Sequence, residues 1–121
     1  MLSAAYAGDL PRVKRLEMEG VDVNCRDDHT ATPLHNAALG GHSDTVEWLL
    51  QSGCDPNIRS VYGFTPLMAA ASRGHGELVR LLASRGARLD AKADNGLSAA
   101  EFATENGHHS VADLIRSLSG P

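Results

Sequence analysis

A period of 33 residues runs through the chain and limits the folds that it can adopt. Three columns of residues show this spacing most clearly: Gly8, Gly41, Gly74 and Gly107; Thr32, Thr65 and Ser98; Asn24, Asn57 and Asp90. Regular repetition at 20–50 residues is typical of proteins built from stacked units. The 121 residues therefore predict one domain of four stacked units, each burying its apolar face against its neighbours.

One period has the pattern of two short helices. Thr32 followed by proline predicts a helix start, because the hydroxyl caps free N–H groups and proline needs no donor there. The first helix is expected over Pro33–Leu39, with Gly41 as a left-handed residue after its end. A second helix is expected over Ser43–Gln51, where apolar residues recur at helical spacing. The turn-forming stretch at 55–57 then leads to the next unit.

The sequence motifs of these units resemble those of ankyrin repeats. The second unit has Thr32-Pro33-Leu34-His35 and later Gly41-His42, and the third has Thr65-Pro66-Leu67-Met68 and Gly74-His75. The resemblance covers nearly the whole chain. It implies an all-α ankyrin-repeat solenoid of helix–turn–helix units joined by β-hairpin-like turns, with repeats at about 1–26, 27–59, 60–92 and 93–121. In layout the chain is similar to small myotrophin-like proteins and to the ankyrin-class inhibitors of cyclin-dependent kinases.

Several residues depart from the family pattern, among them Ser98-Ala99, which replaces Thr-Pro in the last unit. Met68 and Glu101 stand where the second unit has His35, so the Thr32–His35 hydrogen bond cannot recur in the same form. Thr30 stands where the later units have glycine, at a turn that often needs a positive φ. We therefore expect the hairpin at 27–30 to differ in shape from the other two.

The resemblance implies that the chain binds another protein, as an adaptor or inhibitor, through its hairpin tips and the exposed face of its first helices. Transferred residue by residue, the expected contact surface comprises Arg26, Asp28, His29, Arg59, Tyr62, Phe64, Ser72, Arg73, Lys92, Asp94, Asn95 and Leu97.

Two features of this surface carry separate hypotheses. Arg26, Arg59 and Lys92 are 33 residues apart and should form a basic column that suits a partner with an acidic patch. The alternative is a column of solvated charges that contributes little to binding. Tyr62 and Phe64 are of the residue types that dominate interfaces, although Phe64 could instead pack on the next tip.

Composition and motifs argue against several other functions. The net charge of −4 argues against a nucleic-acid-binding domain, and no apolar run is long enough to span a membrane. No catalytic motif is present, so we expect a non-enzymatic chain without cofactors. His42, His75 and His108 are spaced too widely to share one zinc ion, and we expect them to bond backbone carbonyls between repeats rather than bind a metal.

The remaining expectations concern context and modification. Cys25 and Cys54 are interpreted as free thiols in a reducing compartment, which favours the cytoplasm or nucleus. We also expect a monomer. Trp48 and Cys54 are expected in the core. The chain could also be a recognition segment of a larger multidomain enzyme or receptor, and metal or small-ligand binding remains a third hypothesis. The resemblance also places Asn24 and Asn57 where an asparagine hydroxylase can act, although both could simply tie the turn backbone.

Overall fold

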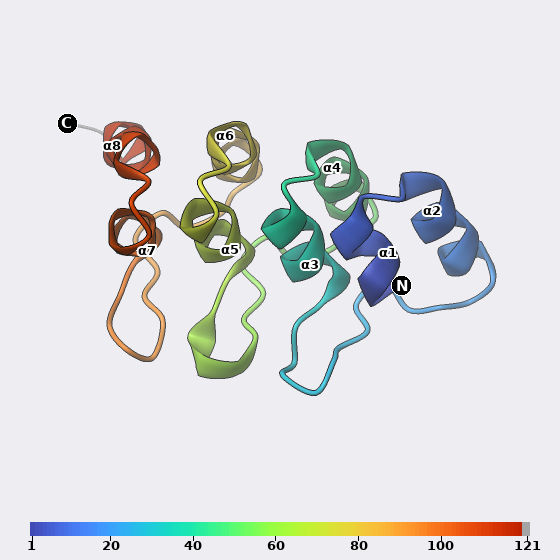
Figure 1. Cartoon of the computed structure of the whole chain (residues 1–121). Helices are drawn as coiled ribbons and strands as arrows, with labels where there is room; N and C mark the ends of the chain where they lie inside the picture. The colour runs from blue at the N-terminus through green and yellow to red at the C-terminus, as the bar shows by residue number, and fades with distance from the viewer. Residues whose placement is uncertain (120–121) are drawn as a thin grey trace.

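Eight α-helices in two rows make up residues 1–119, the part of the chain that the computed structural model describes (Figure 1). The first row holds α1 (Leu2–Ala7), α3 (Pro33–Gly40), α5 (Pro66–Ser72) and α7 (Ala99–Glu105). The second row holds α2 (Leu10–Met18), α4 (Ser43–Gln51), α6 (Gly76–Ser84) and α8 (His109–Leu118). Three hairpin loops project from the side of the first row that faces away from the second row. The predicted all-α solenoid is confirmed.

The helix ends follow the predicted capping residues. Thr32 precedes α3 and its hydroxyl accepts a hydrogen bond from the backbone N–H of His35 at 3.4 Å. Gly41 follows the helix with a φ of 76°, the left-handed conformation expected there. The predicted bounds of the second helix in this unit, Ser43–Gln51, agree with those of α4.

The core lies between the two rows and between successive units. Alanines such as Ala37 and Ala70 are fully buried in the first row, where small side chains let neighbouring helices approach closely. Leu49 and Leu82 are fully buried in the second row. Trp48 is half-buried against this core, as expected. The four units thus share one continuous apolar interior.

A glycine of one unit and a histidine of the next unit make a contact that recurs with the 33-residue period. The imidazole of His42 lies against Gly8, and that of His75 lies against Gly41. A Cβ atom on either glycine would come within 3.0 Å of ring atoms, so only glycine fits. Nε2 of His42 donates to the carbonyl oxygen of Tyr6 at 2.9 Å, and Nε2 of His75 donates to that of Leu39 at 3.3 Å. The predicted inter-repeat bonding is confirmed for these two histidines, whereas the ring of His108 lies against Gly74 without such a bond within residues 1–119.

Candidate functional site

The three hairpins share one closing hydrogen bond and one left-handed residue. The closing bonds measure 2.8–3.0 Å and join the backbone N–H and carbonyl groups of Asp27 and Ala31, Ser60 and Phe64, and Ala93 and Leu97. Thr30 adopts a φ of 60°, close to the 72° of Gly63 and the 85° of Gly96. The expectation that Thr30 gives the first hairpin a different shape is therefore wrong for its backbone. Threonine takes the strained conformation itself, at a cost of about 1 kcal/mol.

The second hairpin is the one that departs from the others. Its tip forms a short 3₁₀ turn, η1 (Val61–Gly63), in which Tyr62 has a φ of 64° and a ψ of 17°. Among the non-glycine residues of 1–119, only Thr30 and Tyr62 have a positive φ. The Tyr62 side chain is 73% exposed, so burial does not compensate for this conformation. Backbone strain of this kind is concentrated at functional sites in proteins.

Backbone hydrogen bonds connect neighbouring hairpins at their tips. The backbone N–H of Val61 donates to the carbonyl oxygen of His29 at 3.0 Å. The backbone N–H of Asp94 donates to the carbonyl oxygen of Tyr62 at 2.8 Å. The three tips therefore form one connected edge, and the position of Tyr62 is fixed from both sides.

The basic column adds a second set of links between hairpins. Nη1 of Arg26 donates to the carbonyl oxygens of Thr30 at 2.7 Å and of Arg59 at 3.0 Å. Nη1 of Arg59 does the same to Gly63 at 3.2 Å and to Lys92 at 3.0 Å. Each arginine thus bonds its own hairpin and the next one. These hydrogen bonds give both arginines a structural role that requires no partner protein.

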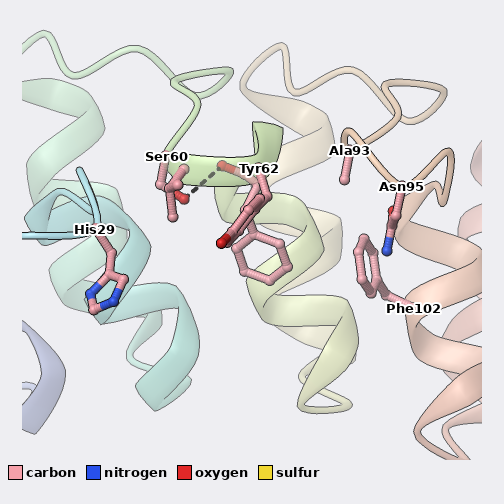
Figure 2. Close-up of a pocket in the computed structure, with 8 residues that line it drawn as sticks. His29, Ser60, Tyr62, Ala93, Asn95 and Phe102 are labelled. Carbon is pink, nitrogen blue, oxygen red and sulfur yellow. Dashed lines mark hydrogen bonds between the residues drawn. The ribbon is translucent and has the colours of Figure 1, made fainter.

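An apolar hollow of about 450 Å³ opens at the hairpins (Figure 2). Its lining comes from all three hairpins and from α7: His29, Ser60, Val61, Tyr62, Phe64, Ala93, Asn95 and Phe102. The rings of Phe64 and Phe102 meet edge to face, with centroids 5.4 Å apart and planes at 84°. Figure 2 shows Tyr62 between His29 on one side and Asn95 and Phe102 on the other. The hollow is the largest concentration of aromatic side chains in a chain with only five of them.

His35 of α3 connects this helix to the second hairpin by a hydrogen bond. Its Nδ1 accepts from the backbone N–H of Thr32 at 3.1 Å, and its Nε2 donates to the carbonyl oxygen of Phe64 at 2.9 Å. Burial lowers the pKa of this imidazole, and the hydrogen bond to Phe64 opposes that effect. In the next unit the sulfur of Met68 accepts from the backbone N–H of Thr65 at 3.4 Å. The bond therefore recurs in another form, as expected.

The family comparison extends over almost all of this framework. The family model described as ankyrin repeats (3 copies) matches residues 1–93 and again 49–119. The chain belongs to the ankyrin-repeat family. Comparison with curated proteins gives no match. Ankyrin repeats are in general modules that bind other proteins.

The predicted contact residues of this ankyrin chain fall into separate groups. His29, Tyr62, Phe64 and Asn95 line the hollow, and Asp28 and Asp94 are exposed beside it on the neighbouring tips. The structure places the other predicted residues outside the lining, on the hairpins or at the end of α5: Arg26, Arg59, Ser72, Arg73, Lys92 and Leu97.

Phe102 is the aromatic lining residue that sequence reasoning missed, and Ser60 and Ala93 also lay outside the predicted contact surface. Its column contains Asn36 and Ala69, so the period gives no sign that an aromatic ring belongs there. The chain has only five aromatic residues, and two of them, Phe64 and Phe102, belong to neighbouring units. This scarcity was the one sequence signal that could have pointed to a contact between them. The sequence alone could not place the two rings in contact.

The other chemical candidates of this ankyrin chain are accounted for by local contacts. Nδ2 of Asn57 donates to the carbonyl oxygen of Gly86 at 3.0 Å, and its Oδ1 accepts from the backbone N–H of Arg88 at 2.7 Å. The side chain of Asn24 is exposed, and hydroxylation of either asparagine stays a prediction.

Both cysteines are free thiols, and Cys54 is buried as expected. Burial raises the pKa of Cys54 to about 11, which makes it a poor nucleophile at neutral pH. Within residues 1–119, no three histidine, cysteine or acidic side chains are grouped so that they could hold a metal ion. The same residues contain no helix with the length and hydropathy needed to cross a membrane.

Proposed function

We propose that this ankyrin chain binds a partner protein through a surface centred on the hollow at its hairpins. The observation that carries the proposal is Tyr62, a strained and largely exposed aromatic residue at the rim of an apolar hollow. Exposed aromatic residues beside a concave apolar surface are the usual anchors of protein interfaces. The proposed contact surface comprises Asp28, His29, Tyr62, Phe64, Asp94, Asn95 and Phe102.

The rigidity of the hairpin edge supports this proposal. The tips are joined by backbone hydrogen bonds at Val61 and Asp94 and by the side chains of Arg26 and Arg59. A surface that is ordered before binding loses less conformational entropy when the partner arrives. An adaptor or inhibitor that acts by occupying a partner's surface needs this property.

Fewer charged side chains than expected support the predicted acidic patch on the partner protein. Arg26 and Arg59 direct guanidinium N–H groups at backbone carbonyls, so Lys92 is the member of the column whose side chain forms no hydrogen bond within residues 1–119. The proposal therefore does not depend on the basic column.

Partner capture with single variants tests the proposal. The whole chain, cross-linked in a native lysate, identifies partners by mass spectrometry, and their affinities are then measured with purified protein. Tyr62→Ala should weaken binding at least tenfold, since anchor residues contribute about 2 kcal/mol or more. Arg80→Ala, an exposed position on α6 outside the lining of the hollow, is the matched control and should leave affinity unchanged. Unchanged affinity of the folded Tyr62→Ala variant for every partner would contradict the proposed site.

A further inference from the structure

We propose that a hairpin turn of a partner protein binds to the outer side of the third hairpin, the side that no following hairpin of this chain covers. The contact uses backbone hydrogen bonds of the kind that join the three hairpins to one another. This inference goes beyond the proposed function, because it concerns a surface other than the hollow. Three observations support it: a free backbone acceptor, a free cationic donor and an uncovered surface beside them.

Each of the first two hairpins binds the next hairpin through the same two groups. The carbonyl oxygens of His29 and Tyr62 accept hydrogen bonds from the backbone of the following hairpin, at 3.0 and 2.8 Å. The guanidinium groups of Arg26 and Arg59 donate to a carbonyl oxygen of the following hairpin, at 3.0 Å in both cases. A tip acceptor and a basic donor therefore form a binding edge that recurs with the 33-residue period.

The third hairpin has the counterparts of both groups, and neither is bonded. Asn95 and Lys92 come 33 residues after Tyr62 and Arg59, and both are exposed. Among residues 1–119, no group donates to the carbonyl oxygen of Asn95, and the ammonium group of Lys92 forms no hydrogen bond or ion pair. Unpaired backbone groups at an edge are a template for pairing with another chain.

The backbone of the third hairpin presents its acceptor as the first hairpin does. Both hairpins contain a turn bond of 2.9 Å, whose N–H donors are Thr30 and Gly96. These two donors have similar positive φ values, 60° and 85°. Asn95, directly before Gly96, holds the position of His29 before Thr30. Since the second hairpin reaches the carbonyl oxygen of His29, a hairpin in the same relation to the third would reach that of Asn95.

The surface beside these two groups is open. A hollow of about 510 Å³ includes Lys92 in its lining, together with Ser98 and Glu101. The counterparts of the last two in the third unit, Thr65 and Met68, are at most 3% exposed. Figure 1 shows the third hairpin as the last loop of the row, with no further loop beside it. The place of a following hairpin is therefore accessible to another protein.

The helices at this end favour a hairpin over a complete further repeat unit. Glu101 and Arg116 are exposed and charged, at positions that hold Met68 and Ala83 in the third unit. Polar side chains on the outer face of a terminal unit are typical of a capped solenoid. The free groups of the third hairpin lie outside this helical face, so capping leaves them available.

A second copy of this chain does not fit the outer side at the spacing of the array. Within residues 1–119, only the first hairpin has the required groups free, the N–H of Asp28 and the carbonyl oxygen of Arg26. Next to that hairpin, α1 packs against α3. The α1–α2 unit of a second copy would therefore occupy the space of α7 and α8. The occupant that remains is a hairpin of another protein.

Titration of the whole ¹⁵N-labelled chain with a cyclic peptide tests this inference. The peptide copies residues 91–98, the hairpin that binds the second hairpin inside the chain, and a disulfide between added terminal cysteines closes it. It should shift the backbone amide signals of Lys92, Asn95 and Gly96 with saturation, at a Kd of about 1 mM.

Two methylated peptides test whether the backbone makes the contact. Methylation of the amide nitrogen copied from Asp94 removes the donor that bonds the preceding hairpin, and should weaken binding about fivefold. Methylation at the residue copied from Lys92 is the matched control, because the N–H of Lys92 forms no hydrogen bond within the described part of the chain. This control peptide should bind as the parent does.

Variants of the chain separate the roles of the two proposed groups. Asn95→Ser keeps the backbone carbonyl and a side-chain acceptor for the N–H of Leu97, so peptide binding should change less than about twofold. Lys92→Met removes the ammonium group and keeps an unbranched stem, and it should weaken binding about fivefold. Arg80→Met, at an exposed position on α6 outside the lining of both hollows, is the control and should have no effect.

The outcomes that overturn the inference are distinct from those that overturn the proposed function. Equal binding of the parent peptide and the peptide methylated at the Asp94 copy would refute backbone pairing. Shifts confined to Tyr62 and Phe102, or no saturable shift up to about 10 mM, would refute the site. A dimer in analytical ultracentrifugation that the peptide dissociates would assign the outer side to a second copy instead. The proposed function fails separately, if Tyr62→Ala retains full affinity for the captured partners, and that variant should leave the peptide titration unchanged.

Discussion

The helices through which successive units stack, called here the stacking side, repeat the same contact from unit to unit. The hairpin tips do not. His42 lies against Gly8, and His75 lies against Gly41 in the same way. At the tips, the equivalent positions hold His29, Tyr62 and Asn95, and the backbone of Tyr62 alone among these three is left-handed. Steric contacts between units restrict the residue types that fit on the stacking side. The tips carry different side chains on a shared hairpin frame, and the strained Tyr62 there is not needed for stacking.

The largest effect should come from removing core volume on the stacking side. Leu49→Ala should lower the free energy of unfolding by about 2–5 kcal/mol, because Leu49 is fully buried and the substitution leaves a cavity. Urea denaturation followed by circular dichroism measures the change. Met18→Ala is the control, since Met18 is 84% exposed, and it should change stability by less than about 0.5 kcal/mol. A loss below about 1 kcal/mol for Leu49→Ala would contradict the core position.

A pair of glycine variants separates the stacking contact from backbone conformation. Gly41 and Gly53 both have a positive φ, of 76° and 97°, but only Gly41 faces a histidine ring. Gly53→Ala should cost about 1 kcal/mol for its backbone conformation alone. Gly41→Ala should cost about 1 kcal/mol more, because the new Cβ meets the ring of His75. Equal losses for the two variants would show that the ring contact does not determine the glycine.

The pH dependence of stability tests the connection between α3 and the second hairpin. Because burial lowers the folded-state pKa of His35 below its ordinary value of 6.5, the unfolded chain binds a proton more readily. The contribution of His35 should therefore be fully present above about pH 6.5 and decrease as the pH falls towards the lowered folded-state value. His35→Met introduces the residue that stands in this position in the third unit.

The measurement is the free energy of unfolding of both proteins between pH 7.5 and 5 by urea titration. The difference between wild type and His35→Met should shrink as the pH falls. A difference that stays constant would mean that His35 does not titrate in this range, and a difference that grows would reverse the assigned sign.

The smallest effect concerns strain at the tip. Tyr62→Gly should raise the free energy of unfolding by about 0.5 kcal/mol, because glycine adopts a positive φ without strain but gains freedom in the unfolded chain. Partner affinity should fall in the same variant. This opposite response of stability and binding would distinguish the tip from the stacking side, where Leu49→Ala lowers stability. Thr30→Gly provides the matched control, with a similar gain in stability and little loss of affinity.

The parts of the molecule that could be predicted from sequence are those where one contact recurs. Thr32 and Gly41 bound a helix by local capping, so the bounds of the helices followed from single residues. The hollow could not be predicted, because it depends on rings from two units meeting at 5.4 Å between Phe64 and Phe102. Spacing did predict the column of Arg26 and Arg59, yet spacing contains no information on whether a guanidinium bonds a carbonyl or a partner.

The arginine links also affect how the hairpins move. Arg26 donates a hydrogen bond to the carbonyl oxygen of Arg59, and Arg59 donates one to that of Lys92. The first hairpin is therefore coupled to the second, and the second to the third. Opening one loop breaks bonds in its neighbour, and we expect hydrogen–deuterium exchange at the three tips to rise together rather than loop by loop. A ligand that immobilises the second hairpin would then slow exchange in the first and third, making the edge a single cooperative element.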